Sequence, residues 1–131
     1  KKDQQKENLE MLEKIVLRYK NKSVIWAWQV ENEPFFPFGV CPWVDRGFVK
    51  KEVKLVKELD SQKRPVVMTD SGEGSFWIQS ALIGDIVGTT MYRKVWFRQI
   101  GIYVHYPFPP VFYWRKAQII KKIFGKNLNG T

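Results

Sequence analysis

Cysteine, histidine and long apolar runs are scarce in this sequence of 131 residues. Cys41 is the only cysteine, which excludes a disulfide within the chain. His105 is the only histidine and has no cysteine cluster beside it, so we expect no metal and no cofactor. No uncharged stretch reaches the ~20 residues of a spanning helix, and the stretch of residues 35–44 also contains two prolines. We therefore expect no membrane segment in this chain.

The opening residues, 1–6, are charged and polar and do not form a signal peptide. With no disulfide pattern and no signal, the sequence leaves the localisation open. Hydrophobic content of 44% and charged content of 27% are typical of a folded domain rather than a disordered one. Aromatic residues are abundant, at 15% with six Trp and nine Phe. Such a content suits either a large core or a sugar-binding cleft, and composition does not separate the two.

The net charge of +9 permits binding to nucleic acid or to an anionic membrane. However, most lysines, such as Lys14, Lys50 and Lys54, fall at positions where solvent-facing helix residues are expected. No nucleic-acid motif is present, so we expect no nucleic-acid partner. The oligomeric state is not indicated.

Apolar periodicity predicts the helices and strands. Apolar residues at helical spacing predict helices over 3–20, 45–60, 75–83 and 113–124. Short β-branched and aromatic runs predict strands over 24–31, 65–70 and 85–92. An aromatic and proline-rich connection, 93–112, precedes the last helix. The alternation of strands and helices predicts parallel β/α units in one domain spanning residues 1–131.

Each predicted strand begins apolar and ends polar, and the longest loops follow these polar ends. Catalytic groups of β/α barrels lie on that face, and open doubly wound sheets bind their ligands there too. An open sheet of the nucleotide-binding kind usually carries a Gly-rich phosphate turn. The sequence Ser71-Gly72-Glu73-Gly74-Ser75 does not match such a turn. The pattern therefore favours a barrel.

The most informative motif is residues 26–34, Trp-Ala-Trp-Gln-Val-Glu-Asn-Glu-Pro. It resembles the fourth barrel strand of clan A glycoside hydrolases, in the form found in families 5 and 42. The resemblance implies an α/β fold, part of a (β/α)8 TIM barrel comprising approximately strands four to six with their helices. It also implies that Glu33 is the general acid/base and that Asn32 binds the 2-hydroxyl of the sugar.

The chemistry explains why these residue types are needed. A glycosidic oxygen leaves only when protonated, and burial among aromatic rings such as Trp28 raises the pKa of a carboxyl group. Strand alternation would place Gln29, Glu31 and Glu33 on one side. A retaining enzyme also needs a second carboxylate about 5–5.5 Å away as nucleophile. The resemblance implies a nucleophile on a seventh strand, absent from this chain.

These observations predict a fragment of a retaining glycoside hydrolase that acts on a β-linked oligo- or polysaccharide and is inactive by itself. Besides Asn32, the expected substrate-binding residues are Trp28, Tyr92 and Trp96. Asp70 and Glu73 lie at the end of the second predicted strand and either bind sugar hydroxyls or shape the turn. Further expectations are Glu31 as a buried partner of an Arg or Lys, Trp43 near the active face, and Trp77 and Trp114 in the core. The alternative is a carbohydrate-binding or scaffold module without catalysis.

Overall fold

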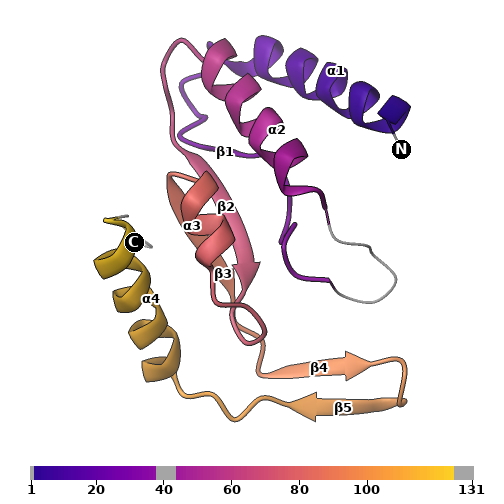
Figure 1. Cartoon of the computed structure of the whole chain (residues 1–131), viewed down its shortest axis with the longest axis vertical. Helices are drawn as coiled ribbons and strands as arrows, with labels where there is room; N and C mark the ends of the chain where they lie inside the picture. Colours follow the sequence, from indigo (N-terminus) through magenta and orange to yellow (C-terminus); the bar gives the residue numbers. More distant parts are fainter. Residues whose placement is uncertain (1, 38–43, 126–131) are drawn as a thin grey trace.

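The computed structural model describes residues 2–37 and 44–125, and its elements follow one another in the order shown in Figure 1. The helices are α1 (Lys2–Tyr19), α2 (Arg46–Leu59), α3 (Ile78–Ile83) and α4 (Pro110–Phe124). The strands are β1 (Trp28–Gln29), β2 (Val66–Ser71), β3 (Ile86–Thr90), β4 (Lys94–Phe97) and β5 (Ile102–His105). All four helices lie within three residues of their predicted bounds. Helical periodicity was therefore a sound guide to the helices.

β1, β2 and β3 form a parallel sheet in chain order, as the alternation of strands and helices predicted. β2 and β3 pair along five residues each, from Val67 opposite Ile86 to Ser71 opposite Thr90. β1 pairs with β2 through only Trp28 and Gln29. The strand predicted over 24–31 is therefore much shorter than expected.

The side chain of Arg64 explains why β1 begins late. Its guanidinium donates hydrogen bonds to the backbone carbonyls of Lys20, Lys22 and Ile25, the last at 3.1 Å. The segment before Trp28 is thus fixed by hydrogen bonds from Arg64 instead of by pairing with a neighbouring strand. A sequence pattern records β propensity but not this competing donor, which lies some forty residues further along the chain.

The expectation of a (β/α)8 barrel segment is wrong. The chain forms four helices and two small sheets, one with three parallel strands and the other an antiparallel pair, β4 with β5. In a barrel, each strand is followed directly by a helix, and all the strands belong to one closed sheet. Here the connection predicted over 93–112 contains a hairpin, in which Lys94 lies opposite His105 and Phe97 opposite Ile102. Gly101, with φ of 65°, supplies the left-handed residue that closes the turn.

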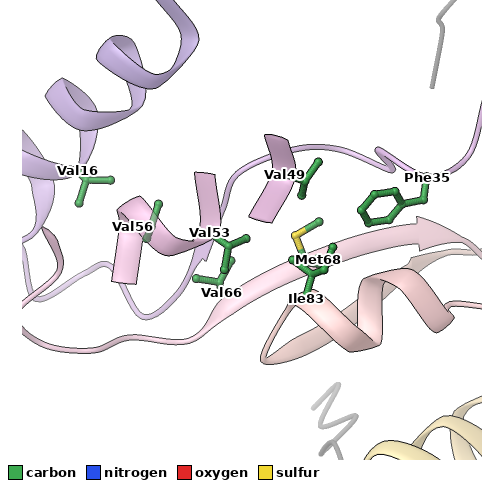
Figure 2. Packing of buried hydrophobic residues seen from close by; sticks show 8 residues of the cluster. All are labelled: Val16, Phe35, Val49, Val53, Val56, Val66, Met68 and Ile83. Carbon is green, nitrogen blue, oxygen red and sulfur yellow. The ribbon is translucent and has the colours of Figure 1, made fainter. Parts of the chain in front are cut away.

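Two groups of buried apolar side chains hold the elements together. The first joins α1, α2, β2 and α3, and Figure 2 shows Val49 and Val53 of α2 close to Val66 and Met68 of β2. Met68, in the middle of β2, is fully buried there. The second group joins α3, β3 and α4 around Trp77, Val87 and Ile120. The sheet is therefore packed by helices, with β2 and β3 carrying one group each.

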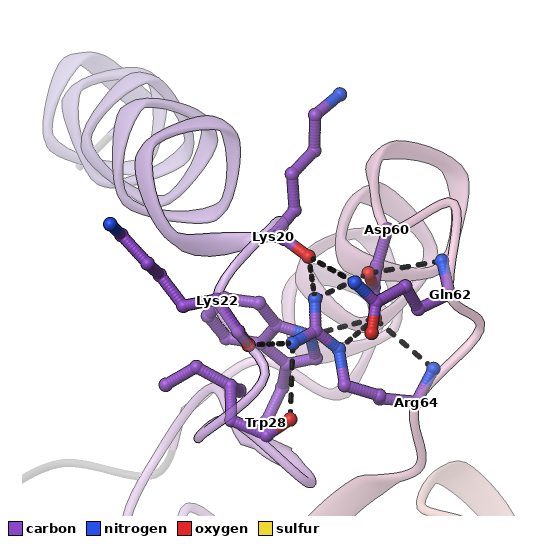
Figure 3. A network of polar contacts seen from close by, with 7 residues as sticks. Lys20, Lys22, Trp28, Asp60, Gln62 and Arg64 are labelled. Atoms are coloured by element: carbon purple, nitrogen blue, oxygen red, sulfur yellow. Dashed lines mark hydrogen bonds and ion pairs between the residues drawn. The ribbon is translucent and has the colours of Figure 1, made fainter.

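A buried ion pair fixes the turn between α2 and β2. Asp60 and Arg64 are 1% and 9% exposed, and their side chains make hydrogen bonds of 2.7 and 2.9 Å. The indole Nε1 of Trp28 donates to the same carboxylate at 3.0 Å (Figure 3). The hydrogen bonds from Arg64 hold the pKa of Asp60 well below its usual range. Through Asp60 and Arg64, this network connects the end of α1, β1 and the end of α2.

The two tryptophans expected in the core have different environments. Trp77 is buried, and its Nε1 donates to the carbonyl of Ser71 at 2.8 Å. Trp114 is 60% exposed, so its predicted core position is wrong. α4 turns Tyr113 and Ile120 inward instead. Among the described helices, none has both the length and the apolar character needed to cross a bilayer.

Candidate functional site

A cavity of about 680 Å³ lies where the polar ends of the parallel strands meet the hairpin. Its lining includes Asn32 and Glu33 from the segment after β1, Tyr92 after β3 and Trp96 from β4. The structure thus brings together four of the five residues predicted for the site. Glu73, from the loop after β2, lines the same cavity.

Glu33 adopts an uncommon backbone conformation with φ of 46°. A residue other than glycine in this left-handed region carries backbone strain, which persists only when surrounding contacts fix it. Two such contacts are present. The N–H of Glu33 donates to Oγ1 of Thr69 at 3.1 Å, and Oγ1 of Thr90 donates to Oε1 of Glu33 at 2.6 Å. The backbone and the carboxylate of Glu33 are therefore both anchored.

Thr69 connects several residues of the motif. Its Oγ1 also accepts from Nε2 of Gln29 at 3.1 Å and lies 3.4 Å from Oδ1 of Asn32, to which it donates. β1 ends at Gln29, so strand alternation does not extend to Glu31 and Glu33. The hydroxyl of a neighbouring strand positions the motif instead.

Glu73 has two hydrogen-bond donors at one oxygen. Its Oε1 accepts from the hydroxyl of Tyr113 at 2.6 Å and from the N–H of Tyr92 at 2.7 Å. Burial, together with this hydrogen bond, raises the pKa of Tyr113 to about 12, so its hydroxyl remains a donor. Lys116 fixes the loop itself by donating to the carbonyls of Gly72 and Ser75, both at 2.5 Å.

Asp70 does not belong to the cavity. It is 1% exposed and accepts from the hydroxyl of Ser80 and the N–H of Ser71, both at 2.9 Å. These bonds satisfy the carboxylate inside the fold. Of the two acids predicted either to bind hydroxyls or to shape the turn, Glu73 reaches the cavity and Asp70 serves the packing of α3 on β2.

Glu31 lines the cavity beside an unusual buried acid on α2. Burial raises the pKa of Glu31. Glu52 is 3% exposed, its Oε2 has no hydrogen-bond partner, and burial together with the charge of Glu31 raises its pKa to about 8. No ion pair to an Arg or Lys is found for Glu31 within the described ranges. The charge that most affects Glu52 is therefore another carboxylate.

The hairpin contributes the aromatic side of the cavity. The rings of Trp96 and Tyr103 lie 4.9 Å apart at 60°, and Nζ of Lys94 lies 4.3 Å from the centre of the Tyr103 ring. Lys94 and Trp96 both line the cavity. A flat indole beside a cation suits a polar ring with an apolar face.

The other predicted residues lie elsewhere. Trp28 is held in the Asp60 network and does not line the cavity. Trp43 lies outside the described residues. His105 is exposed on β5, and in the part of the chain described here no group of His, Cys, Asp and Glu is arranged to hold a metal ion.

Sequence reasoning missed two threonines of the site. Thr69 and Thr90 stand near the carboxyl ends of β2 and β3, where their hydroxyls hold Glu33. Threonine is common in strands because its side chain is β-branched. A threonine in a predicted strand therefore gives no indication that its hydroxyl makes a specific contact. The sequence feature that could have identified them is their position near the ends of two predicted strands.

Comparison of the sequence with protein-family models finds no match, and comparison with curated proteins finds none either. A function for this chain is therefore inferred from the residues of the cavity and from the motif of residues 26–34.

Proposed function

We propose that the cavity binds a β-linked oligo- or polysaccharide and that Glu33 is the general acid/base of a retaining glycoside hydrolase. The observation that carries the proposal is the anchored carboxylate of Glu33, 2.6 Å from the hydroxyl of Thr90, in a cavity that also holds Asn32 and Trp96. A general acid must be held within reach of the leaving oxygen. The resemblance of residues 26–34 to the clan A motif supports the same role.

The remaining cavity residues have roles in this proposal. Asn32 binds the 2-hydroxyl of the sugar, and Trp96 and Tyr92 contact the sugar face. Glu73 is less suited to attack the anomeric carbon, because Oε1 already accepts two hydrogen bonds. The proposal therefore assigns the nucleophile to a carboxylate outside this sequence, and the chain alone is expected to hydrolyse no glycoside.

Chemical rescue tests the acid/base role. The purified chain is incubated with aryl β-glycosides that have a poor leaving group, in the presence of azide, which replaces the missing nucleophile. We expect an α-glycosyl azide and release of the phenol, because Glu33 donates the proton to the leaving oxygen. Glu33→Gln removes that proton donor and is expected to abolish the product. Glu58→Gln, an exposed acid on α2, is the matched control and is expected to retain it.

The pair of Trp96 and Tyr103 also favours the second candidate, a carbohydrate-binding module without catalysis. Titration calorimetry with β-linked oligosaccharides separates the two. Binding that Trp96→Ala weakens, with no azide product, supports the module and contradicts the acid/base role. Absence of binding contradicts both functions.

A further inference from the structure

Almost all of the net positive charge of the chain lies after Asp85, because that part of the sequence has no acidic residue. Residues 86–131 contain eight of the 22 Lys and Arg residues and none of the 13 Asp and Glu residues. In the described part of this segment, residues 86–125, the exposed cations are Arg93, Lys94, Arg98, Arg115, Lys121 and Lys122. We call residues 86–125 the basic segment. An excess of one charge over so long a stretch favours a partner of the opposite sign.

The basic segment also exposes large apolar side chains. They belong to the hairpin and to α4 and are between 47% and 63% exposed: Trp96, Ile100, Ile102, Tyr103, Val111, Trp114, Ile119 and Ile123. Single exposed apolar residues are common on proteins, but a concentration beside cations marks an interaction site.

The hairpin is a sheet of its own. β4 and β5 pair with each other and make no extensive contact with another helix or strand of the described chain, although β4 lines the cavity. Figure 1 shows the hairpin extending away from the three-stranded sheet. An isolated two-stranded hairpin is marginally stable in water, so a surface that covers its apolar side chains also stabilises it.

We propose that the basic segment binds peripherally to an anionic lipid surface. Cations that flank exposed Trp and Ile side chains give the two attractions that interfacial binding needs, charge toward the headgroups and apolar burial at the acyl boundary. Trp114, on α4, suits the headgroup level, where amphipathic rings concentrate. Arg98 and Ile100, which flank Gln99 in the hairpin turn, allow contact with headgroup and acyl chain at the same place.

The aliphatic residues decide between lipid and nucleic acid. Protein surfaces that bind nucleic acid are polar and contact phosphates, with aromatic rings stacking on bases. Ile100, Ile119 and Ile123 serve neither purpose, whereas a bilayer buries them. The binding is peripheral, since none of the described helices is able to span a bilayer. The proposal does not depend on the sugar chemistry of the cavity.

Vesicle sedimentation with the full chain tests the proposal. We expect binding to phosphatidylcholine vesicles with about one-third phosphatidylserine, and at least tenfold weaker binding to phosphatidylcholine alone. Binding should weaken as salt rises from about 0.1 to about 0.5 M. Each lysine near the surface is worth about fivefold in affinity, so Lys121→Gln with Lys122→Gln should weaken binding by more than tenfold.

Matched variants elsewhere control for charge and for apolar area. Lys50→Gln with Lys51→Gln removes two exposed cations from α2 and should leave vesicle binding unchanged. Ile100→Ser and Ile123→Ser should weaken it, whereas Val24→Ser, at an 83% exposed position outside the segment, should not. Circular dichroism of each variant checks that the fold is retained.

Three results would overturn the proposal. One is equal affinity for vesicles with and without phosphatidylserine. Another is equal loss of binding in the Lys50 and Lys121 pairs. The third is binding to single-stranded RNA, or self-association, that is stronger than vesicle binding and is lost in the same variants of the basic segment.

Discussion

The hydroxyl of Thr90 donates a hydrogen bond of 2.6 Å to the carboxylate of Glu33, across a sequence separation of 57 residues. This bond connects the end of β3 to the segment after β1. It is the contact that orients the proposed acid/base toward the cavity.

Thr90→Val keeps the shape of the side chain and removes the hydroxyl. We expect saccharide affinity to fall by about tenfold, equivalent to ~1.4 kcal/mol, because Glu33 loses its orienting donor. Thr90→Ser keeps the donor and should bind within about twofold of the parent chain. Titration calorimetry gives both values, and equal affinities for the valine and serine variants would show that the hydrogen bond is irrelevant to binding.

Tyr113→Phe tests the support of Glu73. It removes the 2.6 Å hydrogen bond to Oε1 and leaves the ring in the second core group. We expect the free energy of unfolding to fall by about 1–2 kcal/mol in urea titrations, because the bond is charge-assisted and partly buried. Tyr103→Phe, at an exposed position on β5, is the control and should change stability by less than about 0.5 kcal/mol.

Arg64→Met tests the buried ion pair. The variant leaves the carboxylate of Asp60 buried without its partner and removes the donor to three carbonyls. A loss of about 3–5 kcal/mol in the free energy of unfolding is expected. Arg64→Lys keeps the charge without the fork of donors and should lose less. A loss under about 1 kcal/mol for the methionine variant would contradict the role of this network.

Acid should weaken the same network. The pKa of Asp60 is lower in the folded chain than in the unfolded chain, chiefly because Arg64 donates to it. Its contribution to stability is therefore full above the ordinary aspartate pKa of ~3.9 and declines as the pH falls below it. Unfolding in urea between about pH 5 and pH 2 measures this decline, which Asp60→Asn should reduce.

Glu52 should have the opposite pH dependence. Its pKa in the folded chain, about 8, lies above the ordinary value of 4.5 because of burial and the charge of Glu31. Folding thus favours the protonated acid, so stability declines as the pH rises from the ordinary value of 4.5 to about 8 and levels off above that. Glu52→Gln should remove this slope and be more stable than the parent at pH 9 by a few kcal/mol. A parent chain with equal stability at pH 6 and pH 9 would exclude the raised pKa.

The helices were predictable because their signals are local. The spacing of Phe48, Val49, Val53 and Val56 predicts α2, and all four are buried. The length of β1 was not predictable, because Arg64 binds the carbonyls that a strand would have used. The hairpin was missed because residues 93–112 are rich in aromatics and end in prolines, which favours a loop, although Gly101 lies between two apolar runs, 95–97 and 102–104. The short β1 and the hairpin are the two features that contradict the expected barrel.

The grouping of four predicted residues around one cavity was predictable, because they follow the polar ends of the expected parallel strands. Asn32, Glu33, Tyr92 and Trp96 do line one cavity. Trp28 is instead bound to Asp60, a contact between residues 32 apart in sequence that no local pattern reveals. Thr69 and Thr90 escaped prediction because their roles depend on the register between strands.

The cavity joins residues near positions 33, 72 and 94, which approach one another only after β1, β2 and β3 have docked. With β1 paired through two residues, that docking is the last and most easily reversed step expected in forming the site. A bound saccharide would hold β1 in place and slow amide hydrogen exchange there more than in α2. The ligand would thus supply the stabilisation that a longer pairing of β1 with β2 would have given. Binding of the saccharide and docking of β1 would then be one coupled equilibrium.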